Sequence, residues 1–411
     1  MRYVIIGNSA AGTFAVEGIR LADRAGEIVV LGNEARAAYS RCLVTHYIEG
    51  RVSEKDMALR GEDFPDRMDA RICYGCRVTS VDVEKRLVYY NEDMSLAYDR
   101  LLIATGASPK VPEIQGIQGP GVYTLRTLDD ARRINVEIAK GERAVVLGAG
   151  PVGLKVAHAL RQRGMRVSVV AGSPHILSRI LDRQGAEIIQ DVLTQHGMEF
   201  HLGAEVREVA RDPAGRVSGV VLADGGELEC RMVVVGKGVQ PNVAFLKDTP
   251  IAVNRGVVVN EHLETNVPGV FAAGDVAETY DLACDEARIN ATWPNAAEQG
   301  RLAGENMAGR RVKYAGSIGM NAIGFYGVPA ITAGRVRVPG PGFEILERLD
   351  RPRRTYRRLV FRDSRLVGFA MVGEVDGAGV LTGLIKQKVT IRDKERLLEG
   401  MLLPPVKLVK A

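Results

Sequence analysis

Tryptophan, histidine and cysteine are scarce in this chain of 411 residues, which holds one Trp, six His and five Cys. An odd number of cysteines in so long a chain argues against a secreted fold stapled by disulfides and fits a reducing compartment. Apolar runs are short too, and none approaches the roughly 18 residues that a membrane-spanning helix needs. The chain opens directly on an apolar strand, without the pattern of a signal peptide. These absences predict a cytoplasmic protein with no membrane span.

The chain also lacks a strong excess of positive or negative charge. The chain has 55 Lys and Arg against 50 Asp and Glu, a formal net charge of +5. So small an excess, without a binding motif, gives no reason to expect nucleic acid as a partner. Glycine, in contrast, is abundant at 46 residues, which indicates many tight turns. The length predicts two or three domains.

One pattern occurs twice along the chain. Residues 3–12 read YVIIGNSAAG and residues 144–153 read AVVLGAGPVG. Each is a short apolar strand that runs into a Gly-rich turn and then a helical pattern, expected over 11–25 and 152–164. A second apolar strand follows each helix, at 28–31 and 167–170. The sequence therefore predicts two βαβ units of the kind that binds one dinucleotide each.

The two Gly-rich turns differ in detail. In the first, Gly7, Ser9 and Gly12 fill the three glycine positions of the phosphate-binding motif, with serine in the middle. Glu34 follows Gly12 by about 20 residues, the distance expected of a carboxylate that binds ribose hydroxyls. The second turn has all three glycines, but Ala-Gly-Ser stands at 171–173, where an acid is expected. No Arg follows at once to grip a 2′-phosphate, so we expect NAD(H) and leave NADP(H) open.

Three further motifs accompany the turns: ATG at 104–106, GKGVQPN at 236–242 and TNVPGVFAAGD at 265–275. In this order they resemble the pyridine nucleotide–disulfide oxidoreductase superfamily. The resemblance implies that the first unit binds FAD and the second NAD(P)H, with hydride transfer between the nicotinamide and flavin N5. It also implies that Asp275 binds the ribityl chain, that Gly238 lies beside the nicotinamide, and that a helix starting near Trp293 points its N-terminus at the flavin.

The resemblance implies a set of cofactor contacts. For FAD these are Gly7, Ser9, Ala10, Ala11, Gly12, Glu34, Ser40, Arg41, Cys42, Val78, Ala104, Thr105, Gly106, Arg126, Gly274, Asp275, Trp293 and Ala296. For the nicotinamide nucleotide they are Gly148, Gly150, Pro151, Val152, Gly153, Gly236 and Gly238.

The predicted fold class is α/β, with two Rossmann-like dinucleotide-binding domains of mostly parallel strands and a small α+β domain at the C-terminus. We place the FAD domain at 1–117 and 242–316 and the NAD(P) domain between them at 118–241. The remaining residues, 317–411, form the small domain. Its β-rich part is expected at 331–372 and its last helix at about 378–388.

Different segments of the sequence resemble two different branches of the superfamily. YSRCLVTHYIEG at 39–50 resembles the redox-cysteine segment of NADH oxidases, NADH peroxidases and CoA-disulfide reductases, with Cys42 at the cysteine. In contrast, LGNE at 31–34, WPNAAEQGRLAGENMAG at 293–309 and the C-terminal region resemble rubredoxin reductases and the FAD portion of nitrite reductases. The longer resemblance favours a FAD-dependent NAD(P)H:acceptor oxidoreductase.

The expected partner is an electron carrier such as rubredoxin or ferredoxin, or an iron–sulfur subunit. The chain could then be the NAD-reducing subunit of a complex such as a 2-oxoacid:acceptor enzyme, or a homodimer. The alternative is an NADH oxidase or a small-disulfide reductase that uses Cys42. A flavoprotein without turnover is a third hypothesis, which the complete second turn argues against.

Two residues are candidates for a catalytic role. Cys42 is a candidate redox thiol, whose thiolate Arg41 and a nearby helix N-terminus would stabilise; its alternative is a small residue that fills the place of a proline. Lys155 stands where many relatives carry Glu, close to flavin N5, and would change the charge there. We expect no metal site, because the CxxC at 73–76 lacks further ligands.

The segment RPRRTYRRLVFRDSR at 351–365 is rich in arginine. It is either a docking face for an acidic electron carrier or an ordinary solvated strand.

Overall fold

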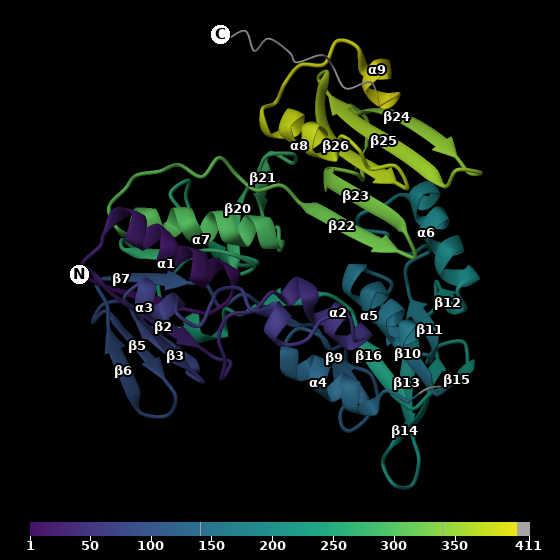
Figure 1. Cartoon of the computed structure of the whole chain (residues 1–411), viewed down its shortest axis with the longest axis horizontal. Helices are drawn as coiled ribbons and strands as arrows, with labels where there is room; N and C mark the ends of the chain where they lie inside the picture. The colour runs from purple at the N-terminus through teal and green to yellow at the C-terminus, as the bar shows by residue number, and fades with distance from the viewer. Residues whose placement is uncertain (140, 339, 401–411) are drawn as a thin grey trace.

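Five parallel strands make the sheet of the first unit, in the order β19-β7-β1-β2-β3. Their bounds are β1 (Arg2–Ile6), β2 (Glu27–Gly32), β3 (Ala70–Tyr74), β7 (Arg100–Ile103) and β19 (Val270–Ala272). The strands read as near-continuous apolar runs because both faces of a parallel sheet are covered. The computed structural model describes residues 1–139, 141–338 and 340–400, and Figure 1 shows this unit beside the N-terminus.

Two helices far apart in sequence cover one face of that sheet. They are α1 (Ala10–Ala22) and α7 (Trp293–Met307). Glycines bring their backbones together: a Cβ at Gly18 would overlap the carbonyl of Arg301, and one at Gly300 would overlap the carbonyl of Ala11. The first unit is therefore built from both early and late parts of the chain.

The first helix is shorter than the sequence predicted, ending at Ala22 instead of about residue 25. Asp23 follows it in an extended conformation. Its carboxylate accepts hydrogen bonds from the backbone N–H groups of Ala25 and Gly26 at 2.9 and 3.0 Å. This local side-chain bonding competes with another helical turn, and so the chain leaves the helix here.

The second unit repeats the parallel arrangement, in the strand order β12-β11-β10-β16-β9. The strands are β9 (Val122–Thr124), β10 (Arg143–Leu147), β11 (Arg166–Ala171), β12 (Met198–Leu202) and β16 (Met232–Val235). Its helices are α4 (Leu128–Glu137), α5 (Pro151–Gln162) and α6 (Arg183–Gln195). A three-stranded antiparallel sheet lies beside it, made of β13 (Val206–Arg211), β14 (Val217–Leu222) and β15 (Glu227–Glu229).

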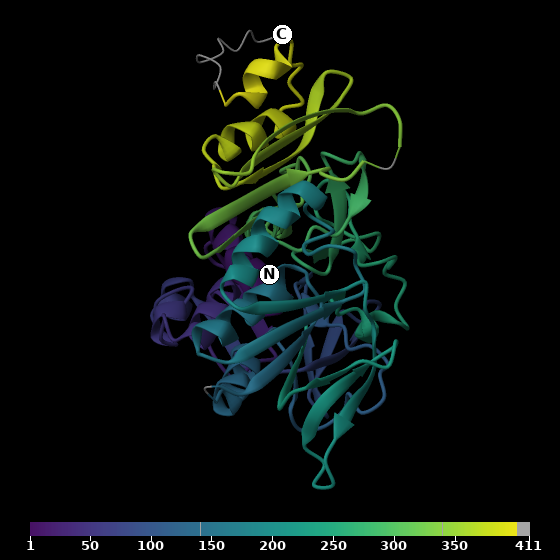
Figure 2. The ribbon, with the colours of Figure 1, turned by 90° about the vertical axis from the view of Figure 1, so that its right-hand side faces the viewer.

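The C-terminal part is an antiparallel sheet in the order β22-β23-β26-β25-β24, with two short helices. The elements are β22 (Met320–Phe325), β23 (Val328–Gly334), β24 (Glu344–Asp350), β25 (Thr355–Arg362), β26 (Arg365–Val372), α8 (Ala378–Lys386) and α9 (Lys394–Leu398). Figure 2 shows this sheet at one end of the molecule, above the second unit. The α/β class with a small α+β part is confirmed. Residues 401–411 of the predicted third domain lie outside the described residues.

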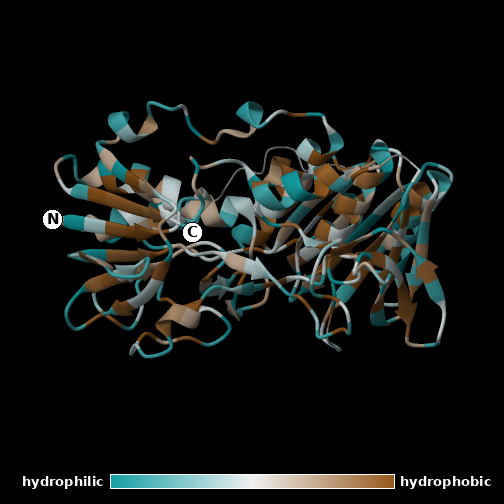
Figure 3. Cartoon of the chain, turned by 90° about the horizontal axis from the view of Figure 1, so that it is seen from below, coloured by the Kyte–Doolittle hydropathy of each residue, from teal (hydrophilic) through white to brown (hydrophobic). Residues whose placement is uncertain are grey.

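Small elements fill the connections. They are α2 (Val44–Glu49), α3 (Phe64–Arg67), the strands β4 (Val78–Asp82), β5 (Leu87–Tyr90) and β6 (Met94–Ala97), and the strands β18 (Val257–Val258), β20 (Ala277–Asp281) and β21 (Glu286–Arg288). Seen from below in Figure 3, the most hydrophobic residues follow the strands of the two parallel sheets and the polar ones gather on the outer loops.

The chain crosses between the two units through a pair of short antiparallel strands, β8 (Ala107–Pro109) and β17 (Val239–Pro241). Asn242 locks this crossing. Its side chain donates to the carbonyl of Thr105 at 2.9 Å, and its own carbonyl accepts from the Thr105 hydroxyl at 2.9 Å. The ATG and QPN motifs of the sequence are thus bonded to one another at the junction.

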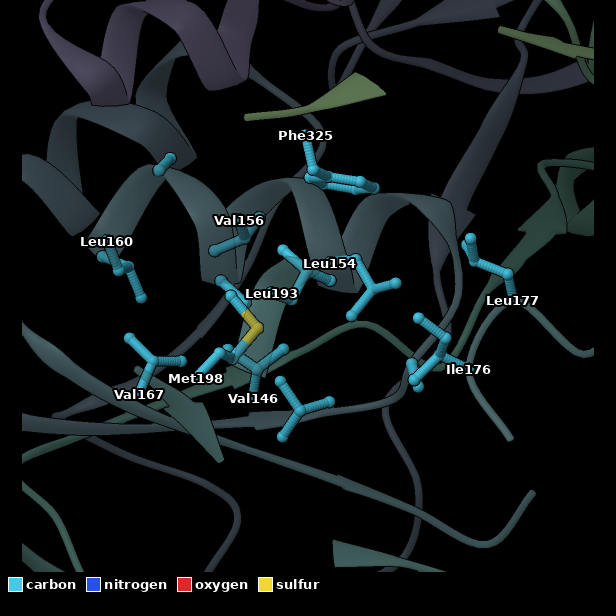
Figure 4. Close-up of a cluster of buried hydrophobic side chains, with 14 of the residues drawn as sticks. Val146, Leu154, Val156, Leu160, Val167, Ile176, Leu177, Leu193, Met198 and Phe325 are labelled. Carbon is cyan, nitrogen blue, oxygen red and sulfur yellow. The ribbon is translucent and has the colours of Figure 1, made fainter. Parts of the chain in front are cut away.

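The third sheet is docked onto the second unit by both apolar and charged contacts. Phe325, from the end of β22, is buried against α5: Figure 4 shows it beside the ribbon of this helix, and its ring centre lies 5.6 Å from that of His158. Around the rim, Arg351 pairs with Glu187 at 2.8 Å and Arg354 donates to Gln195 at 2.8 Å.

The arginines within β25 are engaged as well. Arg358 pairs with Asp182 at 3.3 Å and with Glu347, and Arg362 pairs with Asp285. Four arginines of the segment 351–365 therefore connect parts of this chain, and a docking role of the segment stays a prediction.

Candidate functional site

The first Gly-rich turn packs tightly against the end of β7. Gly7 has a φ of +120°, a conformation that L side chains rarely adopt. A Cβ at Gly7 would overlap the carbonyl of Ala104, and one at Gly12 would overlap the carbonyl of Gly7. Both neighbours are backbone atoms, which cannot move aside as a side chain can. The two glycines therefore let the strand end, the turn and the start of α1 meet.

The N-terminus of α1 is left without a capping side chain. Ser9 occupies the N-cap position but makes no capping hydrogen bond, and the first turn carries no acidic residue. The first N–H groups of a helix have no partner within the helix, and with the helix dipole they favour an anion. This end of α1, with Ala10 and Ala11 as small first residues, suits a phosphate group.

Glu34 is held in place beside this turn. Its two carboxylate oxygens accept hydrogen bonds from the Tyr39 hydroxyl at 2.7 Å and from the Arg41 guanidinium at 2.5 Å. The same guanidinium donates to the Ser9 hydroxyl at 3.3 Å and to the carbonyl of Arg126 at 2.7 Å. Arg41 thus connects the carboxylate with the glycine turn and with a segment of the second unit.

A second ion pair lies nearby. Arg126 pairs with Asp275 at 2.6 Å, and both side chains are mostly shielded from solvent. A Cβ at Gly106 would lie 3.5 Å from the Arg126 guanidinium, so the ATG segment borders the same place. The sequence predicted all three as FAD contacts, and the structure brings them together from three separate segments.

Gly274 closes the space between the starts of two helices. A Cβ there would lie 3.1 Å from the Cβ of Ala11 and 3.6 Å from that of Ala296. The backbone N–H of Gly274 donates to Gln299 at 2.8 Å. The N-termini of α1 and α7 therefore converge on the Gly-Asp motif.

Buried hydroxyl groups near these helix ends test whether a cofactor fits. Within the described part of the chain, the hydroxyls of Thr13 in α1 and of Thr292, the N-cap residue of α7, are buried without a hydrogen-bond partner. An unpaired buried hydroxyl is costly. Two bare helix N-termini, two free hydroxyls and an ordered carboxylate are the donors and acceptors that the phosphates, ribityl chain and ribose of FAD require. The residues present fit the cofactor.

Cys42 lies in a short 3₁₀ turn (Arg41–Leu43) directly before α2 and is exposed. The protein atoms packed around the sulfur raise the pKa of the Cys42 thiol, a hydrogen bond with Ser40 lowers it, and the Asp275 carboxylate raises it further; the net direction is upward. Arg41, which was expected to stabilise a Cys42 thiolate, is bonded to Glu34, and a redox role of Cys42 stays a prediction.

Two predicted FAD residues lie at the edge of this arrangement. Val78 begins β4 and packs in the apolar cluster behind β2 and β7. Trp293 is the first residue of α7 and packs, partly buried, against the core of the first unit. No hydrogen bond or ion pair connects either side chain to the residues around Glu34 in the described structure, and their assignment stays a prediction.

The second Gly-rich turn has the same construction. Gly148 has a φ of +116°, and a Cβ there would lie 2.5 Å from the carbonyl of Gly236. A Cβ at Gly153 would overlap the carbonyl of Gly148. Gly150 is the N-cap residue of α5 and Pro151 its first residue, a position where proline suits a helix.

Further residues extend this second site towards the junction of the units. The side chain of Val152 is half exposed beside the turn, although it is apolar. The carbonyl of Gly238 accepts a hydrogen bond from the N–H of Lys110 at 2.9 Å, which places Gly238 on the crossing between the units. The predicted nucleotide residues thus line one continuous stretch from α5 to the crossing.

Lys155 points at the third sheet. Its ammonium donates to the carbonyl of Gly324 at 3.2 Å and lies 5.3 Å from the centre of the Phe325 ring. Burial lowers the pKa of Lys155, while the nearby Glu49 carboxylate raises it. A catalytic role for this lysine stays a prediction; the contacts observed are with the C-terminal part.

Sequence reasoning missed a buried carboxylate between the units. Glu49, at the end of α2, accepts hydrogen bonds from His46 at 2.9 Å and from His158 of α5 at 3.1 Å, and its side chain is 1% exposed. Burial opposes ionisation of this carboxyl, but the bonds from His158 and His46 outweigh it and lower the pKa of Glu49 to about 2. Tyr39 was missed too, although it lies in the quoted segment 39–50.

The described residues contain no helix long and apolar enough to cross a membrane.

Comparison with known proteins agrees with this geometry. A relative from Aromatoleum evansii, the "NADH-dependent phenylglyoxylate dehydrogenase subunit epsilon", is 32% identical over 393 residues, which cover 95% of this chain and 92% of the relative. An "NADH oxidase" of Methanocaldococcus jannaschii is 32% identical over 355 residues, covering 82% of this chain and 79% of that one. The crystal structure of a ferredoxin reductase from Rhodopseudomonas palustris is similar with a TM-score of 0.88 and 25% identity, covering 96% of both chains.

The model of the family described as "Pyridine nucleotide-disulphide oxidoreductase" matches residues 1–300. The match includes both Gly-rich turns, the crossing and the Gly-Asp motif, and it stops short of the antiparallel sheet. The chain belongs to the pyridine nucleotide-disulphide oxidoreductase family and is an FAD-dependent NAD(P)H oxidoreductase.

Proposed function

We propose that this protein takes electrons from NADH through FAD and exchanges them with a protein redox partner. The observation that carries this proposal is the pairing of two candidate dinucleotide sites on either side of one crossing, together with a Cys42 thiol whose pKa is raised on balance. The relative from Aromatoleum evansii, a subunit of an NADH-dependent dehydrogenase, supports the role of a subunit that exchanges electrons with NAD(H).

The first unit is proposed to bind FAD. The N–H groups at the start of α1 would hold the pyrophosphate, and the Glu34 carboxylate, fixed by Tyr39 and Arg41, would accept hydrogen bonds from the ribose. Asp275 would bind the ribityl chain from its place beside Arg126. When bound, FAD would supply the redox chemistry: it can accept a hydride and give up the two electrons again.

The second unit is proposed to bind the nicotinamide nucleotide. The N-terminus of α5, capped by Gly150 and free of acidic residues in its first turn, would face the pyrophosphate. Gly238 on the crossing would leave room for the nicotinamide, because its chain neighbours aside, no atom of the described residues lies within 4 Å of the place where its Cβ would be. The chain's contribution is to orient the two nucleotides and to shield the place where they meet.

A protein acceptor is favoured over a small disulfide by the state of Cys42. A redox thiol that attacks a disulfide needs an accessible thiolate, and such thiolates lie near positive charge. Here the pKa of Cys42 is raised, with the Asp275 carboxylate among the causes. Neither Arg41 nor a histidine bonds to the sulfur in the described structure.

The second candidate function is that of an NADH oxidase or small-disulfide reductase. It is favoured by the exposure of Cys42 and by its place beside Asp275, where the flavin is expected. The archaeal relative called an NADH oxidase is in keeping with it.

An anaerobic titration of the FAD-loaded protein with NADH separates the two. We expect about one equivalent of NADH to bleach the flavin absorbance, with no long-wavelength thiolate–flavin band, and the same stoichiometry for Cys42→Ser. A requirement for about two equivalents that falls to one in Cys42→Ser would establish the disulfide-reductase alternative. The matched control is Cys284→Ser, because Cys284 is buried away from this site.

A further inference from the structure

The second unit lacks a carboxylate where its strand pattern calls for one. β11 ends at Ala171, and Gly172 and Ser173 follow. In dinucleotide-binding βαβ units an Asp or Glu near this strand end bonds the hydroxyls of the adenosine ribose and thereby selects NAD over NADP. The residues directly after β11 therefore offer no carboxylate to the ribose.

A carboxylate from the next connection fills the same place. Glu205 lies between β12 and β13, on a loop that is bonded to the end of β11. The N–H of Gly203 donates to the carbonyl of Ser173 at 3.0 Å, and that of Ala204 donates to the carbonyl of Ala171 at 3.2 Å. These bonds hold the loop beside the strand end.

The side chain of Glu205 turns over Gly172. A Cβ on Gly172 would overlap the Oε1 atom of Glu205, and the other oxygen of that carboxylate is 3.1 Å from the ammonium of Lys237. The Glu205 side chain remains 61% exposed, so a ligand can reach it, whereas Lys237 is 26% exposed. Glycine at 172 thus provides the room that the carboxylate occupies.

We propose that Glu205 replaces the missing acid and makes the second unit select NAD(H) over NADP(H). The inference rests on the proposed function, in which this unit holds the nicotinamide nucleotide. Glu205 is assigned to accept hydrogen bonds from the ribose hydroxyls, and Lys237 is a positioning residue that holds the carboxylate at the strand end.

The charges at the site explain the direction of selection. A 2′-phosphate carries nearly two negative charges at neutral pH, and a carboxylate at the same place repels it. A ribose hydroxyl instead donates a hydrogen bond to the carboxylate, a charge-assisted bond of the stronger kind. With Glu205 neutralised, Lys237 loses its charged partner and becomes available to a 2′-phosphate. The affinity for NAD(H) should therefore fall while the affinity for NADP(H) rises.

The test measures binding and not turnover. Dissociation constants for NAD⁺ and NADP⁺ are determined by calorimetry on the FAD-loaded wild type, on Glu205→Gln and on the control Glu227→Gln, an exposed glutamate of β15 in the same unit. We expect Glu205→Gln to weaken NAD⁺ binding roughly tenfold and to strengthen NADP⁺ binding, while Glu227→Gln changes neither.

A pair of substitutions tests the contact with Gly172. Gly172→Ala should displace the carboxylate and weaken NAD⁺ binding in the presence of Glu205, but should have a much smaller effect in Glu205→Ala, where the overlapping atoms are absent. Such non-additivity is the signature of two groups that act through one contact.

The outcomes are distinct. If the wild type binds neither nucleotide, the assignment of the second unit fails. If the wild type binds NAD⁺ and Glu205→Gln binds both nucleotides as the wild type does, the role of Glu205 is overturned and the proposed function stands.

Discussion

The two dinucleotide units have the same framework but acquire their carboxylates differently. In the first, Glu34 follows β2 directly and is fixed by bonds from Tyr39 and Arg41. In the second, the strand end is bare and Glu205 reaches it from a neighbouring loop, held by Lys237. The glycine positions, by contrast, are equivalent: a Cβ at Gly12 would overlap the carbonyl of Gly7, as one at Gly153 would overlap that of Gly148.

This difference shows which constraints are set by the backbone and which by a side chain. Where two backbone segments approach this closely, only a residue without a Cβ fits at the point of contact. The glycines must therefore stand at the same spacing in both units. A carboxylate only has to arrive at the right point in space, and any loop that passes there can supply it. We expect substitutions at the glycines to have large effects in both units and substitutions at the carboxylate supports to have smaller ones.

The largest effects are expected from glycine substitutions that impair one unit and leave the other intact. Gly12→Val should cost about 3 kcal/mol of stability through overlap with backbone and lower FAD affinity by roughly 100-fold. The protein would then be purified largely without flavin absorbance. Gly153→Val should leave the flavin in place and abolish NAD⁺ binding measured by calorimetry.

Either variant alone could simply unfold, so the pair is informative through its contrast. Circular dichroism and flavin content are compared for both. If Gly153→Val also lost its flavin while remaining folded, the two units would not be the separate sites that their geometry indicates.

An intermediate effect is expected at Glu49, which joins the units by bonding His158 of α5 from the end of α2. Because the pKa of Glu49 in the folded protein, about 2, lies below its ordinary value, ionised Glu49 stabilises the fold above that ordinary value. The stabilisation is lost as the pH falls towards about 2. Glu49→Gln should lower the free energy of unfolding at neutral pH by about 2–3 kcal/mol.

Chemical denaturation between neutral and acidic pH measures this. The difference between wild type and Glu49→Gln should shrink below the ordinary pKa of a glutamate, whereas Glu54→Gln, which removes a half-exposed ion pair with Arg132, should cost less than about 1 kcal/mol. A difference that stays constant down to the most acidic pH would show that Glu49 acts through packing and not through its charge.

The smallest effect concerns the support of Glu34. Arg41→Met keeps an unbranched apolar stem but removes the bonds of the guanidinium to Glu34, Ser9 and Arg126. We expect FAD affinity to fall roughly fivefold, equivalent to about 1 kcal/mol, as measured by the release of flavin on dilution. Arg36→Met is the matched control, since Arg36 pairs instead with Asp129.

Much of the fold could be predicted from local sequence. The apolar strands at 3–6 and 144–147, the glycine turns and the helices after them depend on neighbouring residues, and the structure has β1, β10, α1 and α5 there. The end of α1 was misplaced because the Asp23 side chain takes over the backbone bonds. The arginines of 351–365 were left undecided because their partners, such as Glu187 and Asp285, lie far away in sequence.

The site was predictable where motifs are contiguous and not where contacts are long-range. Asp275 and Gly274 could be proposed from a motif, but the bond between Asp275 and Arg126 joins residues 149 positions apart. Glu49 and Glu205 carry little local signal, because His158 and Lys237, which bond to them, lie far away in sequence. The environment of Cys42 likewise depends on Asp275, which the segment 39–50 cannot reveal.

The crossing by β8 and β17 has a consequence for how this chain is assembled. Because the two strands pair side by side, everything between them leaves the first unit and returns to it at one point. The intervening residues form a cassette whose removal would leave the two cut ends already adjacent, with no need to rethread either parallel sheet. In its topology the chain is thus one unit into which a second has been inserted at a single point.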